Sequence, residues 1–127
     1  MTLTVISRSL APQVLNEKGE CCIKGAGSSM QPIINTGDKI YLKKVDPSQL
    51  RKGDAVYCKV NGNKFVHLIT AVDSGGKRFQ ISNNKGHTNG WIGPSGVYGL
   101  AVQVEDKVLV SDKELANRLS GDTMLVL

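Results

Sequence analysis

Apolar and polar residues alternate in short runs along much of the chain, as in strands that bury one face. Residues 39–43, for example, read Lys-Ile-Tyr-Leu-Lys, which places the isoleucine and leucine on one face and the lysines on the other. Asn-Gly at 61–62 separates two such runs and favours a tight hairpin, because both central residues must tolerate positive φ. The predicted strands are at about 39–45, 55–60, 64–72, 78–82, 97–104 and 107–110. This pattern predicts a mainly β fold, a coiled antiparallel sheet or partly open barrel.

Residues 1–24 are expected to form an N-terminal segment that leads into the sheet. Leu3 and Val5 fit an edge strand, and Pro12 and the pair Lys18-Gly19 are turn signals. We therefore expect little helix in this part of the chain.

A capping box marks the start of a helix near the C-terminus. Residues 111–114 read Ser-Asp-Lys-Glu, in which the serine side chain accepts a hydrogen bond from an orphan amide of the first turn while the glutamate reaches back. This predicts a short helix over 111–120, ended by Gly121, and then a tail over 121–127. No linker, repeat or low-complexity tract interrupts the 127 residues, so we expect one domain with its β core over 25–110.

Composition narrows the classes of function. The net charge is +5, but the lysines are spread along strands and turns, which is typical of a solvated sheet face. A nucleic-acid surface gathers such charges around stacking aromatic side chains, and Trp91 is the only tryptophan, so we do not expect nucleic acid as a partner. No run approaches the roughly 18 apolar residues of a membrane span, and we expect a cytoplasmic protein.

The three cysteines, Cys21, Cys22 and Cys58, have neither the spacing of a zinc site nor the even number of a disulfide framework. We interpret them as reduced thiols, and we expect no metal and no cofactor. Asp38 and Asp54 each follow a glycine just before a strand. We interpret both as turn and capping residues rather than as catalytic acids.

One series of motifs carries candidate chemistry. Residues 27–32 read Gly-Ser-Ser-Met-Gln-Pro, and they are followed by Gly37-Asp38 before one strand, Gly53-Asp54 before the next, and His67 on the strand after that. This series resembles the superfamily of LexA-type repressor peptidases and type I signal peptidases, in which Ser-Met-x-Pro and two Gly-Asp turns precede a lysine or histidine base. The resemblance covers most of the chain. It implies the coiled β fold of these peptidases, with Ser29 as the nucleophile.

His67 is the strongest candidate for the base that a serine nucleophile needs. Alternation along its strand places Phe65, His67 and Ile69 on one face, so the imidazole lies among apolar neighbours. Burial there is expected to lower the pKa of His67 and keep the ring neutral and able to accept a proton. A core histidine bonded to a backbone carbonyl is the alternative interpretation. Lys64 falls on the opposite face, where we expect it to extend into water.

The residue that orients His67 is not fixed by the sequence. In the histidine-dependent relatives, a loop that reads Lys-Gly-Asp-Asn supplies an aspartate, and this chain has His87 where that aspartate falls. His87, Asp73 and Asn84 are the candidate orienting residues. The stretch 80–91, rich in asparagine and glycine, also suits a loop whose role is structural.

Two functional hypotheses follow. The first is a serine peptidase with a Ser29–His67 dyad, an oxyanion held by the backbone amide of Ser29 with help from Ser28, and a peptide or protein as substrate. The resemblance implies cleavage after small residues. The second is an inactive module that keeps the peptidase fold for interaction or structure, as in a phage or bacterial assembly, and that forms homo-oligomers or binds an assembly partner. His87 in place of an aspartate favours the second hypothesis.

Overall fold

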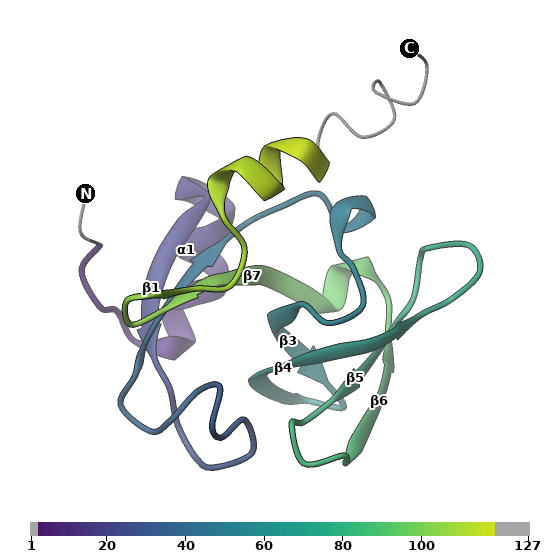
Figure 1. The fold of residues 1–127 in the computed structure, drawn as a ribbon, viewed down its shortest axis with the longest axis horizontal. Helices are drawn as coiled ribbons and strands as arrows, with labels where there is room; N and C mark the ends of the chain where they lie inside the picture. Colours follow the sequence, from purple (N-terminus) through teal and green to yellow (C-terminus); the bar gives the residue numbers. More distant parts are fainter. Residues whose placement is uncertain (1–2, 119–127) are drawn as a thin grey trace.

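The fold is mainly β, as predicted. The computed structural model of the chain describes residues 3–118, in which the strands form one antiparallel sheet (Figure 1). The strand order is β1-β2-β7-β3-β4-β5-β6, and β8 pairs with β7. The strands are β1 (Glu20–Lys24), β2 (Lys39–Lys43), β3 (Ala55–Val60), β4 (Asn63–Val72), β5 (Phe79–Ser82), β6 (Thr88–Ile92), β7 (Val97–Val104) and β8 (Lys107–Val108).

The alternation predicts the central strands correctly and misses two others. β2, β3, β4, β5 and β7 lie where the apolar runs place them, and Asn61 and Gly62 form the hairpin turn between β3 and β4 with φ of 49° and 84°. β1 lies inside the expected N-terminal segment, and β6 begins inside the stretch 80–91, whose composition also suits a structural loop. In β6, polar residues and Gly90, at φ 146°, replace the alternating apolar pattern on which the prediction depends.

A helix, α1 (Ala11–Lys18), replaces the turns expected in the N-terminal segment. Pro12 lies in its first turn, where a missing N–H costs no helical hydrogen bond, and Gly19 caps its end in the left-handed conformation at φ 80°. The two residues are therefore the start and stop of a helix. The expected edge strand is reduced to one bridge, between Val5 and Cys22. The single-turn 3₁₀ helices are η1 (Arg8–Leu10), η2 (Pro47–Gln49) and η3 (Pro94–Gly96).

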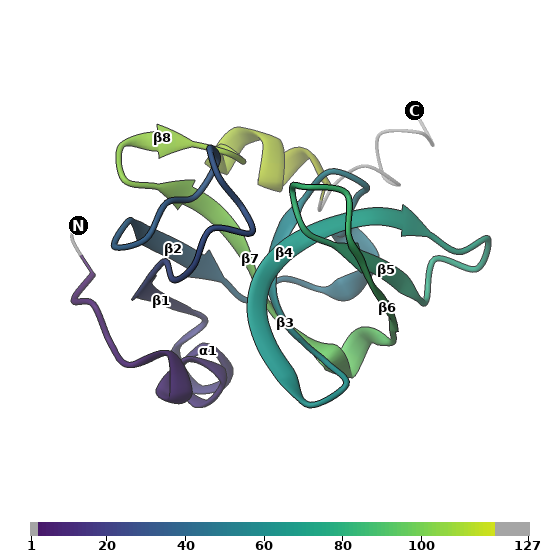
Figure 2. The same cartoon turned by 90° about the horizontal axis from the view of Figure 1, so that it is seen from below.

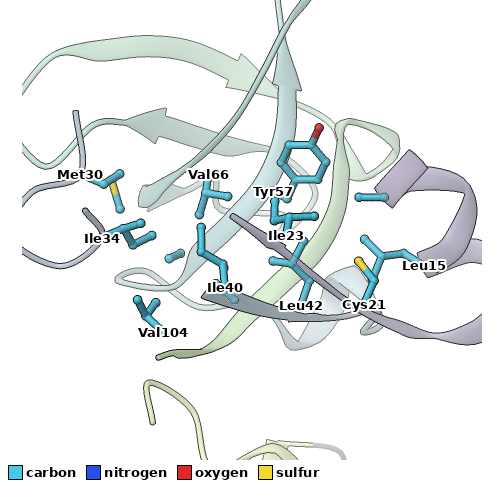
Figure 3. Close-up of a cluster of buried hydrophobic side chains, with 13 residues drawn as sticks. Leu15, Cys21, Ile23, Met30, Ile34, Ile40, Leu42, Tyr57, Val66 and Val104 are labelled. Atoms are coloured by element: carbon cyan, nitrogen blue, oxygen red, sulfur yellow. The ribbon is translucent and has the colours of Figure 1, made fainter. Parts of the chain in front are cut away.

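The middle of the sheet is buried on both faces. Along β3, Ala55 and Tyr57 belong to one cluster of buried apolar side chains, whereas Val56 and Cys58 belong to a second cluster. Successive side chains of a strand point to opposite faces, so the two clusters lie on the two sides of β3. The first cluster, drawn in Figure 3, packs side chains of α1 and of strands β1 and β2 against those of β3 and β7. The second joins β3 to β5 and β6, which lie together on the other side of the molecule in Figure 2.

The predicted helix near the C-terminus begins where the capping box places it. Residues 112–118 are helical, and Ser111 Oγ accepts a hydrogen bond from the backbone amide of Glu114 at 3.0 Å. Only half of the capping box is formed, because the Glu114 side chain turns forward along the helix instead of reaching back. The predicted end at Gly121 and the tail 121–127 lie outside the described residues.

An ionic cluster of Asp54, Glu114 and Arg118 attaches this helix to the sheet. The Arg118 guanidinium binds both carboxylate oxygens of Asp54, at 2.8 and 3.0 Å, and Glu114 at 2.7 Å. Asp54 also accepts a hydrogen bond from the backbone amide of Arg51, so it caps the turn before β3 as predicted. We call these three side chains the Arg118 cluster.

Candidate active site

A closed loop between β1 and β2 carries Ser29. Backbone hydrogen bonds between Gly25 and the Gly37-Asp38 turn join the ends of the loop, at 2.7 and 2.9 Å. A Cβ at position 25 would lie 2.6 Å from the carbonyl oxygen of Asn35, so this close approach requires glycine. Met30 is buried and anchors the loop in the core, which leaves Ser29 half-buried at the surface.

The loop brings Ser29 to His67, 38 positions later in the chain. Ser29 Oγ and His67 Nε2 are 3.0 Å apart, which is a hydrogen-bond distance. His67 lies in the middle of β4, opposite Val56 of β3, and is 5% exposed. The ring of Phe65 stacks on the imidazole with a centroid separation of 3.8 Å and an angle of 18°. The apolar neighbours expected from strand alternation are therefore present around the imidazole.

Asn89 holds the other side of the imidazole. Its Oδ1 lies 2.8 Å from His67 Nδ1. An amide oxygen can only accept, so Nδ1 carries the proton and the lone pair of Nε2 faces Ser29. Asn89 is positioned by a bulge, because Ser82 of β5 pairs with Thr88 and Ile81 pairs with Gly90, which leaves Asn89 as the extra residue. A bulge re-aims the side chain of the residue that it inserts.

This arrangement corrects the expectation that His87, Asp73 or Asn84 orients the histidine. His87 is exposed in the turn between β5 and β6, where its backbone amide binds Asn83 Oδ1 at 2.9 Å. Asp73 lies in the preceding hairpin, between β4 and β5, where its carboxylate accepts hydrogen bonds from the backbone amides of residues 77 and 78. Sequence reasoning missed Asn89, because several asparagines lie close together in this stretch. Only the position of β6 and its bulge shows that Asn89 is the one that binds His67.

Asn84 joins the nucleophile loop to the β5–β6 turn. Its backbone amide donates to the Ser29 carbonyl at 2.9 Å, and its side-chain amide donates to the Gln31 carbonyl at 3.0 Å. In Figure 1 the loop and the turn accordingly lie next to each other. Because the turn leads into β6, the contacts of Asn84 fix the distance between Ser29 and the strand that carries Asn89.

Burial lowers the pKa of His67 below its ordinary value. The hydrogen bond that His67 Nδ1 donates to Asn89 opposes this change by stabilising the charged ring, and repulsion from His87 adds to the lowering. The net effect keeps the imidazole neutral at neutral pH. A neutral ring in the tautomer set by Asn89 can accept a proton from Ser29.

The expected oxyanion donors differ in their surroundings. The backbone amide of Ser29 makes no hydrogen bond to any residue in 3–118, so it is free to donate to a ligand. The side chain of Ser28 is exposed, and its carbonyl accepts from Gln31 at 3.2 Å as part of a turn. The geometry therefore favours the amide of Ser29 over the hydroxyl of Ser28 as the donor.

A small hollow of about 20 Å³ opens beside Ser29. This volume is close to that of one water molecule or one methyl group. Its lining includes the apolar side chains of Met30, Ile34, Ile40 and Val66, which lie in the same half of the cluster in Figure 3. The remaining lining residues are Arg8, Gly25, Ala26 and Phe65.

The other residues singled out by the sequence lie away from this site. Lys64 is exposed and its Nζ lies 5.9 Å from the centroid of the Tyr98 ring. Cys21, Cys22 and Cys58 are free and buried, and burial raises the pKa of Cys58 to about 12. Within residues 3–118, no three metal-binding side chains are grouped so that they could hold an ion.

The comparisons with known proteins leave the chain without an assigned family. No described helix is long and apolar enough to cross a membrane. A scan against protein-family models finds no match to the chain, and a search of curated proteins also finds none.

Proposed function

We propose that the chain is a serine peptidase domain in which Ser29 is the nucleophile, His67 is the general base and Asn89 orients the base. One observation carries this proposal: a continuous line of hydrogen bonds runs from Ser29 Oγ through the His67 ring to Asn89 Oδ1, at 3.0 and 2.8 Å. A nucleophile, a base and a group that orients the base, each within hydrogen-bond reach of the next, form the arrangement that activates a hydroxyl group.

The site offers a chemical group for each step of peptide hydrolysis. Ser29 Oγ attacks the carbonyl carbon of the scissile bond, its proton passes to His67 Nε2, and the carbonyl electrons move onto the oxygen. The backbone amide of Ser29 donates a hydrogen bond to that oxygen. The C–N bond then breaks, and His67 gives its proton to the leaving amine. Water attacks the acyl group along the same proton path, which releases the acid and restores Ser29.

Asparagine can serve as the third residue of the Ser29–His67–Asn89 line because its side-chain oxygen fixes the tautomer of the His67 ring without carrying a charge. Cysteine peptidases with a Cys-His-Asn arrangement use an asparagine in the same way. An aspartate would also stabilise the imidazolium that forms in the transition state, and Asn89 provides only a neutral dipole for this purpose. The proposed enzyme therefore has a weaker base than a Ser-His-Asp enzyme.

The proposal includes membership of the superfamily of LexA-type and signal peptidases and cleavage after a small residue. The order of Ser-Met-x-Pro, two Gly-Asp turns and a histidine supports the membership. The hollow of about 20 Å³ supports the specificity, because this volume is close to that of one small group. No carboxylate within residues 3–118 binds His67, which favours the second candidate, an inactive module that retains this fold.

Labelling with a fluorophosphonate probe distinguishes the two candidates. The probe is expected to modify Ser29 in the wild type, located by mass spectrometry of the peptide, and to leave Ser29→Ala and His67→Gln unmodified. Ser74→Ala is the matched control, because this serine is exposed in the β4–β5 turn, and it should label like the wild type. Labelling that persists in Ser29→Ala, or that is absent from the wild type between pH 5 and 9, would rule out the peptidase.

A further inference from the structure

The hollow beside Ser29 has one charged residue in its lining, Arg8. Arg8 lies in η1, in the segment that leads into α1. This segment runs beside β1, where the backbone amide of Ile6 binds the carbonyl of Cys22 at 2.9 Å. The Arg8 guanidinium therefore lies at the site, although Arg8 belongs to a part of the chain outside the series of motifs that predicted Ser29 and His67.

Two contacts hold the Arg8 side chain at the hollow. Its Nη1 donates to the carbonyl of Lys24 at 2.9 Å, and its guanidinium carbon lies 5.6 Å from the centroid of the Tyr57 ring, a cation–π distance. The hydroxyl of Tyr57 in turn donates to the Arg8 carbonyl at 3.0 Å. The residue is thus fixed at both its backbone and its side chain, and its charge occupies a defined place.

The Arg8 guanidinium has no carboxylate partner among the described residues. One of its five N–H groups is used by Lys24, and the others are free to donate. Arg118 shows the contrast, because its guanidinium binds Asp54 through two parallel hydrogen bonds. A fixed, half-buried guanidinium with open donors is suited to a carboxylate supplied by a ligand.

We infer that the site prefers peptides that carry an acidic side chain next to the small residue that fills the hollow. This inference rests on the proposed function, in which that small residue precedes the bond cleaved by Ser29. The apolar side chains in the lining contact the small side chain, and Arg8 in the same lining binds the neighbouring carboxylate by charge-assisted hydrogen bonds. The ligand class is therefore a small–acidic peptide segment.

Binding to an inactive variant tests the inference without requiring turnover. Fluorescent peptides with a central alanine and Asp, Asn or Lys at each flanking position are titrated into Ser29→Ala, and anisotropy reports their affinity. At one flanking position, the Asp peptide should bind about tenfold more tightly than the Asn peptide, as expected for one charge-assisted hydrogen bond. The difference should shrink in high salt, which screens the carboxylate from the guanidinium.

Variants at two arginines assign the preference to one residue. Adding Arg8→Gln to Ser29→Ala should remove the distinction between Asp and Asn, and Arg8→Lys should retain part of it. Arg51→Gln is the matched control, because this arginine is exposed and, within residues 3–118, its side chain binds only carbonyl oxygens of its own turn. Equal affinity for the Asp and Asn peptides at every position, or a preference that survives Arg8→Gln, would overturn the inference. Fluorophosphonate labelling of the wild type reports separately on the proposed function.

Discussion

Two sets of polar side chains join distant parts of this chain, one neutral and one ionic. Ser29, His67 and Asn89 form a line of neutral groups, whereas the Arg118 cluster is built from full charges. Burying charges is costly unless they are paired, and a paired carboxylate and guanidinium hold each other in place. A neutral imidazole costs less to bury and keeps a lone pair for a proton. The ionic cluster therefore holds the C-terminal helix to the sheet, whereas the neutral line leaves a lone pair facing a hydroxyl group, which is the arrangement that the proposed function needs.

The largest effect on folding should come from breaking the ionic cluster. In Asp54→Asn, the Arg118 guanidinium, only 11% exposed, loses the carboxylate that binds it through two hydrogen bonds. We expect the free energy of unfolding to fall by about 3 kcal/mol, measured by chemical denaturation, because the largely buried guanidinium keeps only the more exposed Glu114 as a carboxylate partner in the described part of the chain. The fluorophosphonate labelling rate of the folded protein should stay unchanged, since the neutral line does not involve Asp54.

Lys43→Gln is the matched control for this change. Its ion pair with Asp112, at 3.1 Å, lies at the surface, where Asp112 is 94% exposed, so the expected loss is below about 0.5 kcal/mol. Equal losses in the two variants would contradict the distinction between a buried and an exposed pair. A lower labelling rate in folded Asp54→Asn would show that the two regions are coupled.

A smaller effect is expected from changing the neutral line at Asn89. Asn89→Ala removes the hydrogen bond that fixes the His67 ring, and the labelling rate should fall about tenfold, the equivalent of one hydrogen bond. Asn89→Asp places a negative charge beside Nδ1, which raises the pKa of His67 and strengthens it as a base, so labelling at neutral pH should become faster. The measurement is the labelling rate as a function of pH.

Asn63→Asp is the matched control for the added charge. Asn63 is exposed at the start of β4, about 13 Å along the strand from His67, so its charge should have little effect on the ring. If Asn89→Ala labels as fast as the wild type, Asn89 does not act through His67. If Asn89→Asp labels more slowly, a neutral third member is required rather than merely tolerated.

The sequence predicts that Ser29 and His67 lie together, but it does not identify Asn89 as the residue that binds the other side of the imidazole. Ser29 and His67 belong to a series of motifs that follow one another in a characteristic order, and the burial of His67 follows from the alternation of β4. The position of Asn89 depends on the pairing of β5 with β6 and on a bulge, and β6 lacks the alternation from which a strand and its register are predicted. Pro12 and Gly19 are ambiguous in a similar way. Each of them is found in turns and at helix ends, and only the helical residues between them decide which applies.

The smallest effect in this comparison is electrostatic and concerns His87. Burial lowers the pKa of His67, so between that value and the ordinary pKa of about 6.5 the unfolded chain binds more protons than the folded chain. Stability therefore rises with pH through this window and is lost as pH falls. His87→Asn removes a repelling charge, so the pKa of His67 should rise and the window should narrow. The chain has two histidines, so NMR titration of this variant follows His67 alone, and an unchanged or lower pKa would contradict the repulsion.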